Sequence, residues 1–258
     1  MTAKITVGDI YSFINEIAPF SLQQSYDNSG ICAGSRDMPV TRVLTSLDIT
    51  SAVVDEAAAK GCELVLSHHP VIFRPLRTLS PDNPAVKLAV KGIAAICMHT
   101  SFDSAEGGMN DLLAAKLGFT VREVLDYDDG KPMGYVCKPE KTFTARALAE
   151  HCKTLLGCKV VRFTDAPAPI DLIGVCSGSG GSCLKAALSK GCGALITGDV
   201  KHSDFVAASD CGFCLIDAGH YYTENIFHAD IARRLCERFK GLEVVPAESF
   251  PDPVQIVT

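Results

Sequence analysis

Five of the seven histidines lie where predicted strands end, which is where open α/β sheets place their ligand sites. Two of them, His68 and His69, are adjacent, and Pro70 follows. Neighbouring side chains within a strand point to opposite faces, but beyond the strand end the backbone can turn both imidazoles toward one cavity. Because neutral imidazole is a common metal ligand near pH 7, the pair predicts metal binding.

Two further histidines each precede a carboxylate by four residues. His99 is followed by Asp103 in HTSFD, and His220 is followed by Glu224 in GHYYTE. Such a pair lies on one face if a helix begins at the histidine. A lone histidine after a strand is more often an ordinary hydrogen-bonded residue than a ligand. His202 by itself is therefore weaker evidence for metal binding than the paired residues are.

The donor set is larger than one four-coordinate ion needs. His68, His69 and His220 offer three nitrogens, while Asp103 and Glu224 offer two carboxylates that can each bridge, which makes about seven bonds. This number suits two divalent ions with open positions for water. Zinc, manganese, iron or cobalt would all accept these nitrogen and oxygen ligands.

Hydrophobic periodicity predicts the α/β elements that position these side chains. Strands alternate with helices, which favours parallel or mixed sheets with helices on their faces. The predicted strands are 43–48, 62–67, 93–97, 170–176, 193–197, 213–217 and 242–248. The predicted helices are 7–18, 50–60, 84–92, one near 109–118, one ending at Lys190, and 223–239.

The two halves of the chain repeat this order. Lys-Gly-Cys at 60–62 recurs at 190–192, each time after an Ala-rich helix and before an apolar strand. We therefore expect an internal duplication with lobes 1–128 and 129–258 and with the metal pair at their seam. The polar region 125–142 is the expected connection between the lobes.

Composition limits the classes of partner and compartment. The net charge of −6 implies no basic face, which argues against nucleic acid as the main partner. We expect a cytoplasmic protein, because the N-terminus lacks the apolar core of a signal peptide and no run is long enough to span a membrane. The twelve cysteines are then expected to be reduced.

Two other motifs carry weaker signals. Cys211 and Cys214 form one C-x-x-C, but they straddle a predicted loop-to-strand boundary, whereas a redox pair usually opens a helix. The SGSGGS segment at 177–182 can expose amides to a phosphate or can simply be a tight turn before a helix. It lacks the lysine of a P-loop and matches no nucleotide fingerprint.

The chain resembles the Nif-three-like proteins, often catalogued as the GTP cyclohydrolase 1 type 2 family. The order and spacing of several motifs over nearly the whole chain carry this resemblance. They are YDNSGICAG (26–34), SLDIT (46–50), SHHP (67–70), HTSFD (99–103), GSGG (178–181), TGDVKH (197–202) and AGHYYTE (218–224). Tyr26 stands where the family usually has Trp, and at 258 residues the chain is a short form without the family's inserted domain.

The resemblance implies a fold of two intertwined, duplicated α/β lobes with mixed sheets flanked by helices. It also implies a homohexamer and a dinuclear metal site. The family's ligands fall on His68, His69, Asp103, His220 and Glu224, while His99 and His202 match positions expected to contact a small-molecule substrate.

Three functions remain open from the residues. The first is a metal-dependent hydrolase acting on a nucleotide or phosphoester-type substrate, since two ions would activate a shared water. The second is a non-catalytic, metal-binding hexameric adaptor or regulatory protein. The third is an oxidoreductase that uses Cys211 and Cys214, and it depends on those two residues alone.

Overall fold

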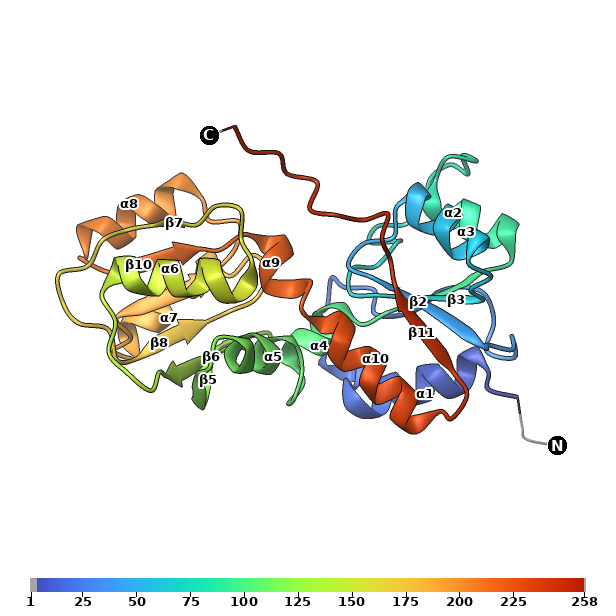
Figure 1. Cartoon of the computed structure of the whole chain (residues 1–258), viewed down its shortest axis with the longest axis horizontal. Helices are drawn as coiled ribbons and strands as arrows, with labels where there is room; N and C mark the ends of the chain where they lie inside the picture. Colours follow the sequence, from blue (N-terminus) through green and yellow to red (C-terminus); the bar gives the residue numbers. More distant parts are fainter. Residues whose placement is uncertain (1–3, 258) are drawn as a thin grey trace. The chain divides into compact units, whose positions relative to one another are not determined.

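The computed structural model describes residues 4–257 and divides into two compact units. Among the described residues, unit 1 comprises 4–105 and 227–254, and unit 2 comprises 106–226 and 255–257 (Figure 1). The chain thus leaves unit 1 and later returns to it. In the described part of the chain, no helix is long and apolar enough to cross a membrane.

Unit 1 contains a mixed five-stranded sheet in the order β1-β4-β3-β2-β11. Its strands are β1 (Gly30–Ala33), β2 (Arg42–Ser46), β3 (Leu64–Ser67), β4 (Ala94–Cys97) and β11 (Glu243–Pro246). Strands β4, β3, β2 and β11 are parallel, and β1 pairs with β4 in the antiparallel direction. The carboxyl ends of β2, β3 and β4 therefore lie at one edge of the sheet.

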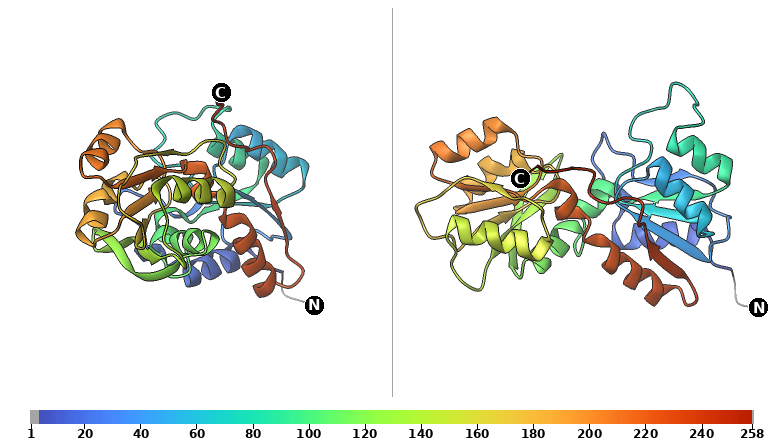
Figure 2. Two further views of the ribbon diagram at one scale, coloured as in Figure 1. Left: turned by 60° about the vertical axis from the view of Figure 1, so that its left-hand side comes forward. Right: turned by 45° about the horizontal axis from the view of Figure 1, so that its top comes forward.

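Helices cover both faces of this sheet (Figures 1 and 2). The unit contains α1 (Val7–Ile17), the short helix η1 (Phe20–Leu22), α2 (Ser51–Ala59), α3 (Pro84–Lys91), α4 (His99–Ser104) and α10 (Phe227–Arg238). On one face, Val53 and Leu88 from α2 and α3 pack with Leu44, Val65 and Ala95 of the strands. Thr50 accepts a hydrogen bond from Val53 N, which fixes the start of α2 where the sequence predicts it.

Unit 2 contains a mixed six-stranded sheet in the order β5-β6-β8-β9-β10-β7. Its strands are β5 (Thr120–Asp128), β6 (Lys131–Lys138), β7 (Arg162–Phe163), β8 (Ile173–Val175), β9 (Ala194–Thr197) and β10 (Cys214–Asp217). Strands β8, β9 and β10 are parallel, while β6 and β7 join their outer edges in the antiparallel direction.

The helices of unit 2 also form two layers. They are α5 (Met109–Lys116), α6 (Ala145–Leu156), η2 (Gly181–Cys183), α7 (Leu184–Ser189), α8 (His202–Asp210) and α9 (His220–Glu224). Side chains of α5 and α6 pack on one face of the sheet with Ile173, Ile196 and Ile216. Side chains of α7 and α8 pack on the other face with Leu195 and Leu215.

The predicted fold class, α/β with two mixed sheets flanked by helices, is confirmed. The parallel set β2-β3-β4 in unit 1 corresponds in order to β8-β9-β10 in unit 2, and each set carries one antiparallel strand beside its last member. A common order of this kind is what an internal duplication predicts.

The structure differs from the sequence expectations at three places. Region 125–142 is largely a hairpin of the unit 2 sheet rather than a connection between lobes. Asp129 and Gly130 both have positive φ at its turn, as a two-residue hairpin loop of type I′ requires. The predicted helix 223–239 is two helices, α9 and α10, which belong to different units.

The third difference concerns the boundaries of the lobes. The division at 128/129 places all later residues in one lobe, whereas Phe227–Val254 belongs to unit 1. The reason is that β11 pairs with β2 along its whole length, and α10 packs against both strands. Pairing of strands some 200 residues apart leaves no local signal in the sequence.

Helix α10 buries a histidine against β2. His228 Nδ1 lies 2.9 Å from Thr45 Oγ1, and burial lowers the pKa of His228 to about 4 from the ordinary 6.5. Between these two values the unfolded chain binds a proton that the folded chain does not. The contribution of neutral His228 to stability is therefore fully present above pH 6.5, and it is lost as the pH decreases toward 4.

We predict that acidification from about pH 7.5 to pH 5 removes about 2 kcal/mol of unit 1 stability through His228. The variant His228→Asn keeps a polar atom near Thr45 but has no titrating group, so its loss over this interval should be smaller by that amount. Urea unfolding at the two pH values measures the difference. Equal losses in wild type and variant would contradict the assignment.

Candidate metal centre

His68 and His69 follow β3 and lie side by side. The backbone beyond Ser67 remains tied to the turn after β2, because His68 N donates to Ser46 O and His69 N donates to Leu47 O. The two imidazole centroids are 5.0 Å apart, and the His68 side chain is fully buried. The expectation that the chain turns both rings the same way beyond the strand end is met.

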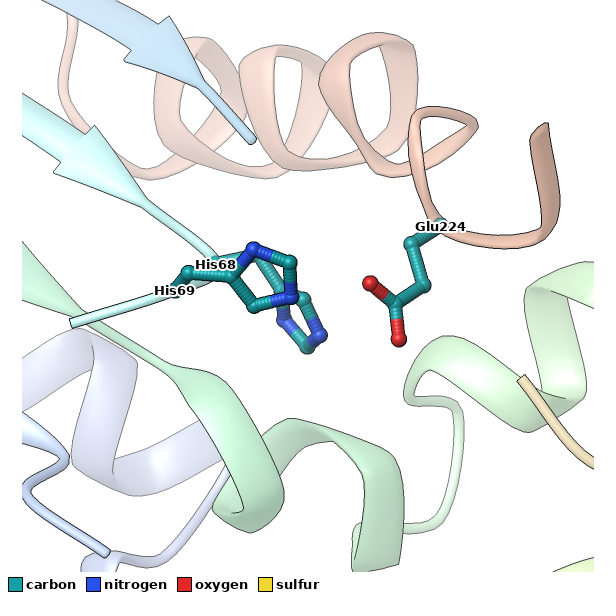
Figure 3. Close-up of side chains that lie close together, drawn as sticks. All are labelled: His68, His69 and Glu224. Atoms are coloured by element: carbon teal, nitrogen blue, oxygen red, sulfur yellow. The ribbon is translucent and has the colours of Figure 1, made fainter. Parts of the chain in front are cut away.

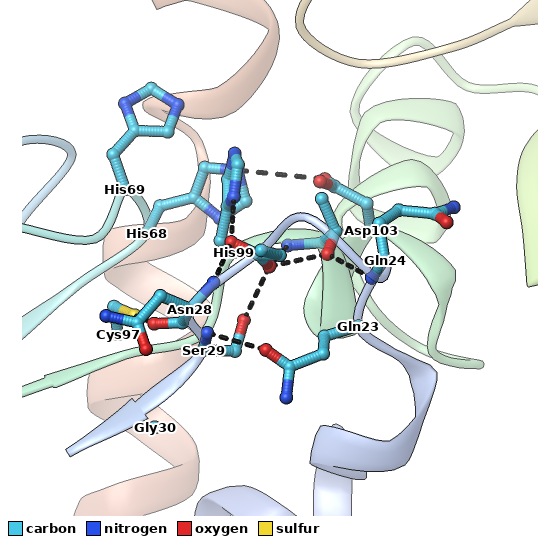
Figure 4. A network of polar contacts seen from close by, with 12 residues as sticks. Gln23, Gln24, Asn28, Ser29, Gly30, His68, His69, Cys97, His99 and Asp103 are labelled. Carbon is cyan, nitrogen blue, oxygen red and sulfur yellow. Dashed lines mark hydrogen bonds and ion pairs between the residues drawn. The ribbon is translucent and has the colours of Figure 1, made fainter. Parts of the chain in front are cut away.

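A third imidazole completes a histidine cluster within unit 1. His99 begins α4 directly beyond β4, and its ring centroid is 5.4 Å from that of His68 and 5.4 Å from that of His69. Asp103 lies one turn further along α4, with Oδ1 3.7 Å from His68 Nε2 (Figure 4). The helical turn that begins at His99 therefore brings the carboxylate to the cluster.

Carboxylates hold two of these rings by their Nδ1 atoms. Asp27 Oδ1 is 2.7 Å from His99 Nδ1, and Asp48 Oδ1 is 3.0 Å from His69 Nδ1. A ring that donates from Nδ1 keeps its lone pair on Nε2, which is the arrangement found behind metal-bound histidines. Each of these two rings can therefore offer Nε2 to a metal or to a substrate.

The side chain of Asp27 is fully buried yet remains ionised. Burial raises the pKa of its carboxyl group, but hydrogen bonds and charge from His99, with a further hydrogen bond from Thr100, bring that pKa well below its usual range. Thr100 donates to Asp27 both from its backbone N, at 3.1 Å, and from its hydroxyl. Hydrogen bonds from α4 thus stabilise the ionised Asp27 carboxylate that contacts His99.

Unit 2 carries the second histidine and carboxylate pair. His220 begins α9, and its Nε2 lies 2.8 Å from Oε2 of Glu224, whose side chain is buried. The other ring nitrogen, Nδ1, is 2.8 Å from Asp199 Oδ2. His220 therefore repeats the carboxylate-backed geometry of His69 and His99. A helix does begin at His220, so the condition under which His220 and Glu224 share one face is met, although the sequence predicted a helix only from residue 223.

A glycine lies close beside this pair. Gly178 has φ +61°, and a Cβ added there would lie 2.2 Å from Glu224 Oε1 and 3.4 Å from His220 Nε2. Its N–H donates to Thr223 Oγ1, and its carbonyl accepts from Gly198 N. The SGSGGS segment thus serves as a tight turn that leaves room for the Glu224 carboxylate.

The described residues contain a candidate metal-ligand group made of two imidazoles and one carboxylate, His68, His69 and Glu224 (Figure 3). Asp103 and His220 contact His68 and Glu224, respectively. His99 lies in the histidine cluster, whereas His202 is exposed at the first residue of α8. The assignment of all seven residues stays a prediction.

Three orienting carboxylates, Asp27, Asp48 and Asp199, received no role from the sequence. Each lies inside a motif that carries the family resemblance, YDNSGICAG, SLDIT or TGDVKH, so the motifs were the available signal. Their partners lie 72, 21 and 21 residues away, and spacing alone could not assign those partners.

Comparison with known proteins identifies the family. A family model described as Duf34/NIF3 (NGG1p interacting factor 3) matches residues 5–253. The chain belongs to the Duf34/NIF3 family. This confirms the resemblance drawn from the motifs.

Relatives match over almost their whole length. A Clostridium perfringens protein named GTP cyclohydrolase 1 type 2 homolog is 30% identical, with 97% of this chain and 99% of that protein covered. A Helicobacter pylori protein named GTP cyclohydrolase 1 type 2 is 34% identical, again with 97% and 99% covered. The family motifs therefore lie within a full-length match.

Solved structures agree with the Duf34/NIF3 fold. A Staphylococcus aureus hypothetical protein matches with a TM-score of 0.87 at 26% identity, with 99% of this chain and 100% of that chain covered. A Bacillus cereus protein related to NIF3 matches with a TM-score of 0.87 at 21% identity and the same coverage. The latter likeness concerns the fold alone.

We predict that Gly178→Ala destabilises the protein more than Gly191→Ala does. Both glycines have positive φ, so each substitution costs about 1 kcal/mol of backbone strain. At position 178 the added Cβ also clashes with Glu224, which should cost about 1–3 kcal/mol more. At position 191 nothing lies within 4 Å of the added Cβ. Urea unfolding of both variants measures the difference, and equal losses would show that Glu224 does not need the space.

Proposed function

We propose that this Duf34/NIF3 protein binds two divalent metal ions through His68, His69, Asp103, His220 and Glu224 and acts as a metal-dependent hydrolase. The substrate class proposed is a nucleotide or another phosphoester. The observation that carries the proposal is the repeated carboxylate contact to Nδ1 of His69, His99 and His220.

The chemistry of the donors fits divalent ions. Imidazole nitrogen and carboxylate oxygen suit zinc, manganese, iron and cobalt alike. An orienting carboxylate fixes the tautomer of a ligand histidine and raises its basicity, and such partners typically change metal affinity 10–100-fold. Buried Glu224 brings a negative charge that a bound cation would compensate.

Two bound ions would lower the pKa of a shared water and polarise the bond to be hydrolysed. The side chains have separate roles around that chemistry. Glu224 is a buried carboxylate that can accept a proton from water. His99 donates from Nδ1 to Asp27, so its Nε2 can accept a hydrogen bond or a proton from a substrate. Asp199 holds the His220 ring in place.

A non-catalytic role is the second candidate. A yeast relative, 28% identical over 289 residues, bears the name NGG1-interacting factor 3, which describes a protein interaction rather than a reaction. Metal ions would then stabilise or regulate an adaptor. The homohexamer implied by the resemblance, and a cytoplasmic location, are compatible with either role and stay predictions.

We predict that protein from metal-replete medium contains about two divalent ions per chain. Glu224→Gln keeps the size of the side chain but removes its charge, so at least one ion should be lost. His151→Ala is the matched control, because His151 lies on α6 with its Nε2 bonded to Leu117 O. Plasma mass spectrometry counts the ions. One ion or none in the wild type would rule out a dinuclear site.

We predict turnover in a panel of nucleotides and phosphoesters. Chelation should abolish it, and at least one of zinc, manganese, iron or cobalt should restore it. Glu224→Gln should lower kcat/KM by about 100-fold or more, as loss of a general base does. His151→Ala should retain activity. Full metal occupancy without turnover of any substrate in the panel would favour the adaptor instead.

A further inference from the structure

Two cysteines face each other across β1 and β4 in unit 1. Cys32 Sγ and Cys97 Sγ are 3.6 Å apart, about 1.5 Å more than a disulfide bond. The strands are antiparallel neighbours, and their register shifts between Ile31 and Ala33, so Cys32 is the extra residue of a bulge. The bulge accounts for the approach of two thiols that do not form a ladder pair.

The two thiols differ in their access to solvent. Cys32 is partly exposed, whereas Cys97 is fully buried. A small oxidant from solvent can therefore reach Cys32 first, with Cys97 held beside it. The pKa of the Cys32 thiol is lowered overall. Hydrogen bonding with Cys97 and with the backbone N–H groups of Ile72 and Val71 lowers this pKa by more than burial raises it. A larger thiolate fraction favours attack on an oxidant.

We propose that Cys32 and Cys97 form a peroxide-reactive site that closes to a disulfide. The Cys32 thiolate attacks one oxygen of hydrogen peroxide, the O–O bond breaks, and after protonation Cys32 sulfenic acid and one water result. The Cys97 sulfur then attacks the Cys32 sulfur, and the hydroxyl leaves with the Cys97 proton as a second water. Two thiols are oxidised by two electrons in total, and one peroxide is reduced to two waters.

The pair lies next to the contacts that hold His99. Cys97 Sγ is 2.9 Å from Asn28 O and donates to it, and Asn28 follows Asp27 (Figure 4). The disulfide has no S–H, so oxidation removes this donor and ties β1 to β4 beside the Asp27 turn. The chemistry depends on the two sulfurs alone and is independent of the proposed hydrolase activity.

The test uses the purified full chain with whatever metal it carries. The protein is reduced, freed of reductant, treated with an equimolar amount of hydrogen peroxide and then alkylated. Peptide mass spectrometry should show a Cys32–Cys97 cross-link, lighter by two hydrogens, as the dominant product, and dithiothreitol should reverse it. Recovery of both cysteines in alkylated form, or of Cys32 as sulfinic acid beside alkylated Cys97, would overturn the proposal.

Variants separate this pair from the other thiols. Cys97→Ala should leave Cys32 as a sulfenic acid that dimedone traps, because the resolving thiol is gone. Cys211→Ser is the matched control, since Cys211 is exposed and lies in unit 2, and the Cys32–Cys97 peptide should form as in wild type. Loss of that peptide in Cys211→Ser would show that the cross-link arises by exchange through Cys211. If Cys97→Ala folds poorly, the peptide mass spectrometry of the wild-type protein still shows whether the Cys32–Cys97 disulfide forms.

Discussion

A carboxylate behind an imidazole is the contact on which the candidate site depends. It occurs with Asp27 and His99, with Asp48 and His69, and with Asp199 and His220. At His69 and His99 the carboxylate at Nδ1 leaves the lone pair of Nε2 available to a ligand. At His220 the second nitrogen, Nε2, lies 2.8 Å from Glu224 Oε2. The cost of burying the Asp27 charge is offset by the hydrogen bonds from α4, which makes the local fold and the orientation of His99 inseparable.

Topology brings these groups together within each unit. Parallel strands end at a common edge, and in unit 1 that edge carries Asp48, His68, His69 and His99 in the turns after β2, β3 and β4. In unit 2 the corresponding turns carry Gly178, Asp199 and His220. At Gly178 a side chain would meet the Glu224 carboxylate.

The sequence predicted the parts of this arrangement whose signals are local. The adjacent pair His68–His69 and the i, i+4 pairs beginning at His99 and His220 could be placed because a strand end and a helix start determine them. The hairpin at Asp129–Gly130 was misread because its charged flanks resemble a linker, although Asp-Gly is itself a hairpin signal. The pairing of β11 with β2 and the partners of Asp27 depend on distant segments, which periodicity cannot assign.

Anomalous X-ray diffraction at the absorption edge of the bound metal tests the proposed metal site most directly. A dinuclear site should give two anomalous peaks per chain, about 3.5–4 Å apart. Each should lie about 2.0–2.2 Å from ligand atoms drawn from His68, His69, Asp103, His220 and Glu224. A single peak, or peaks bound by other residues while these five remain unligated, would contradict it.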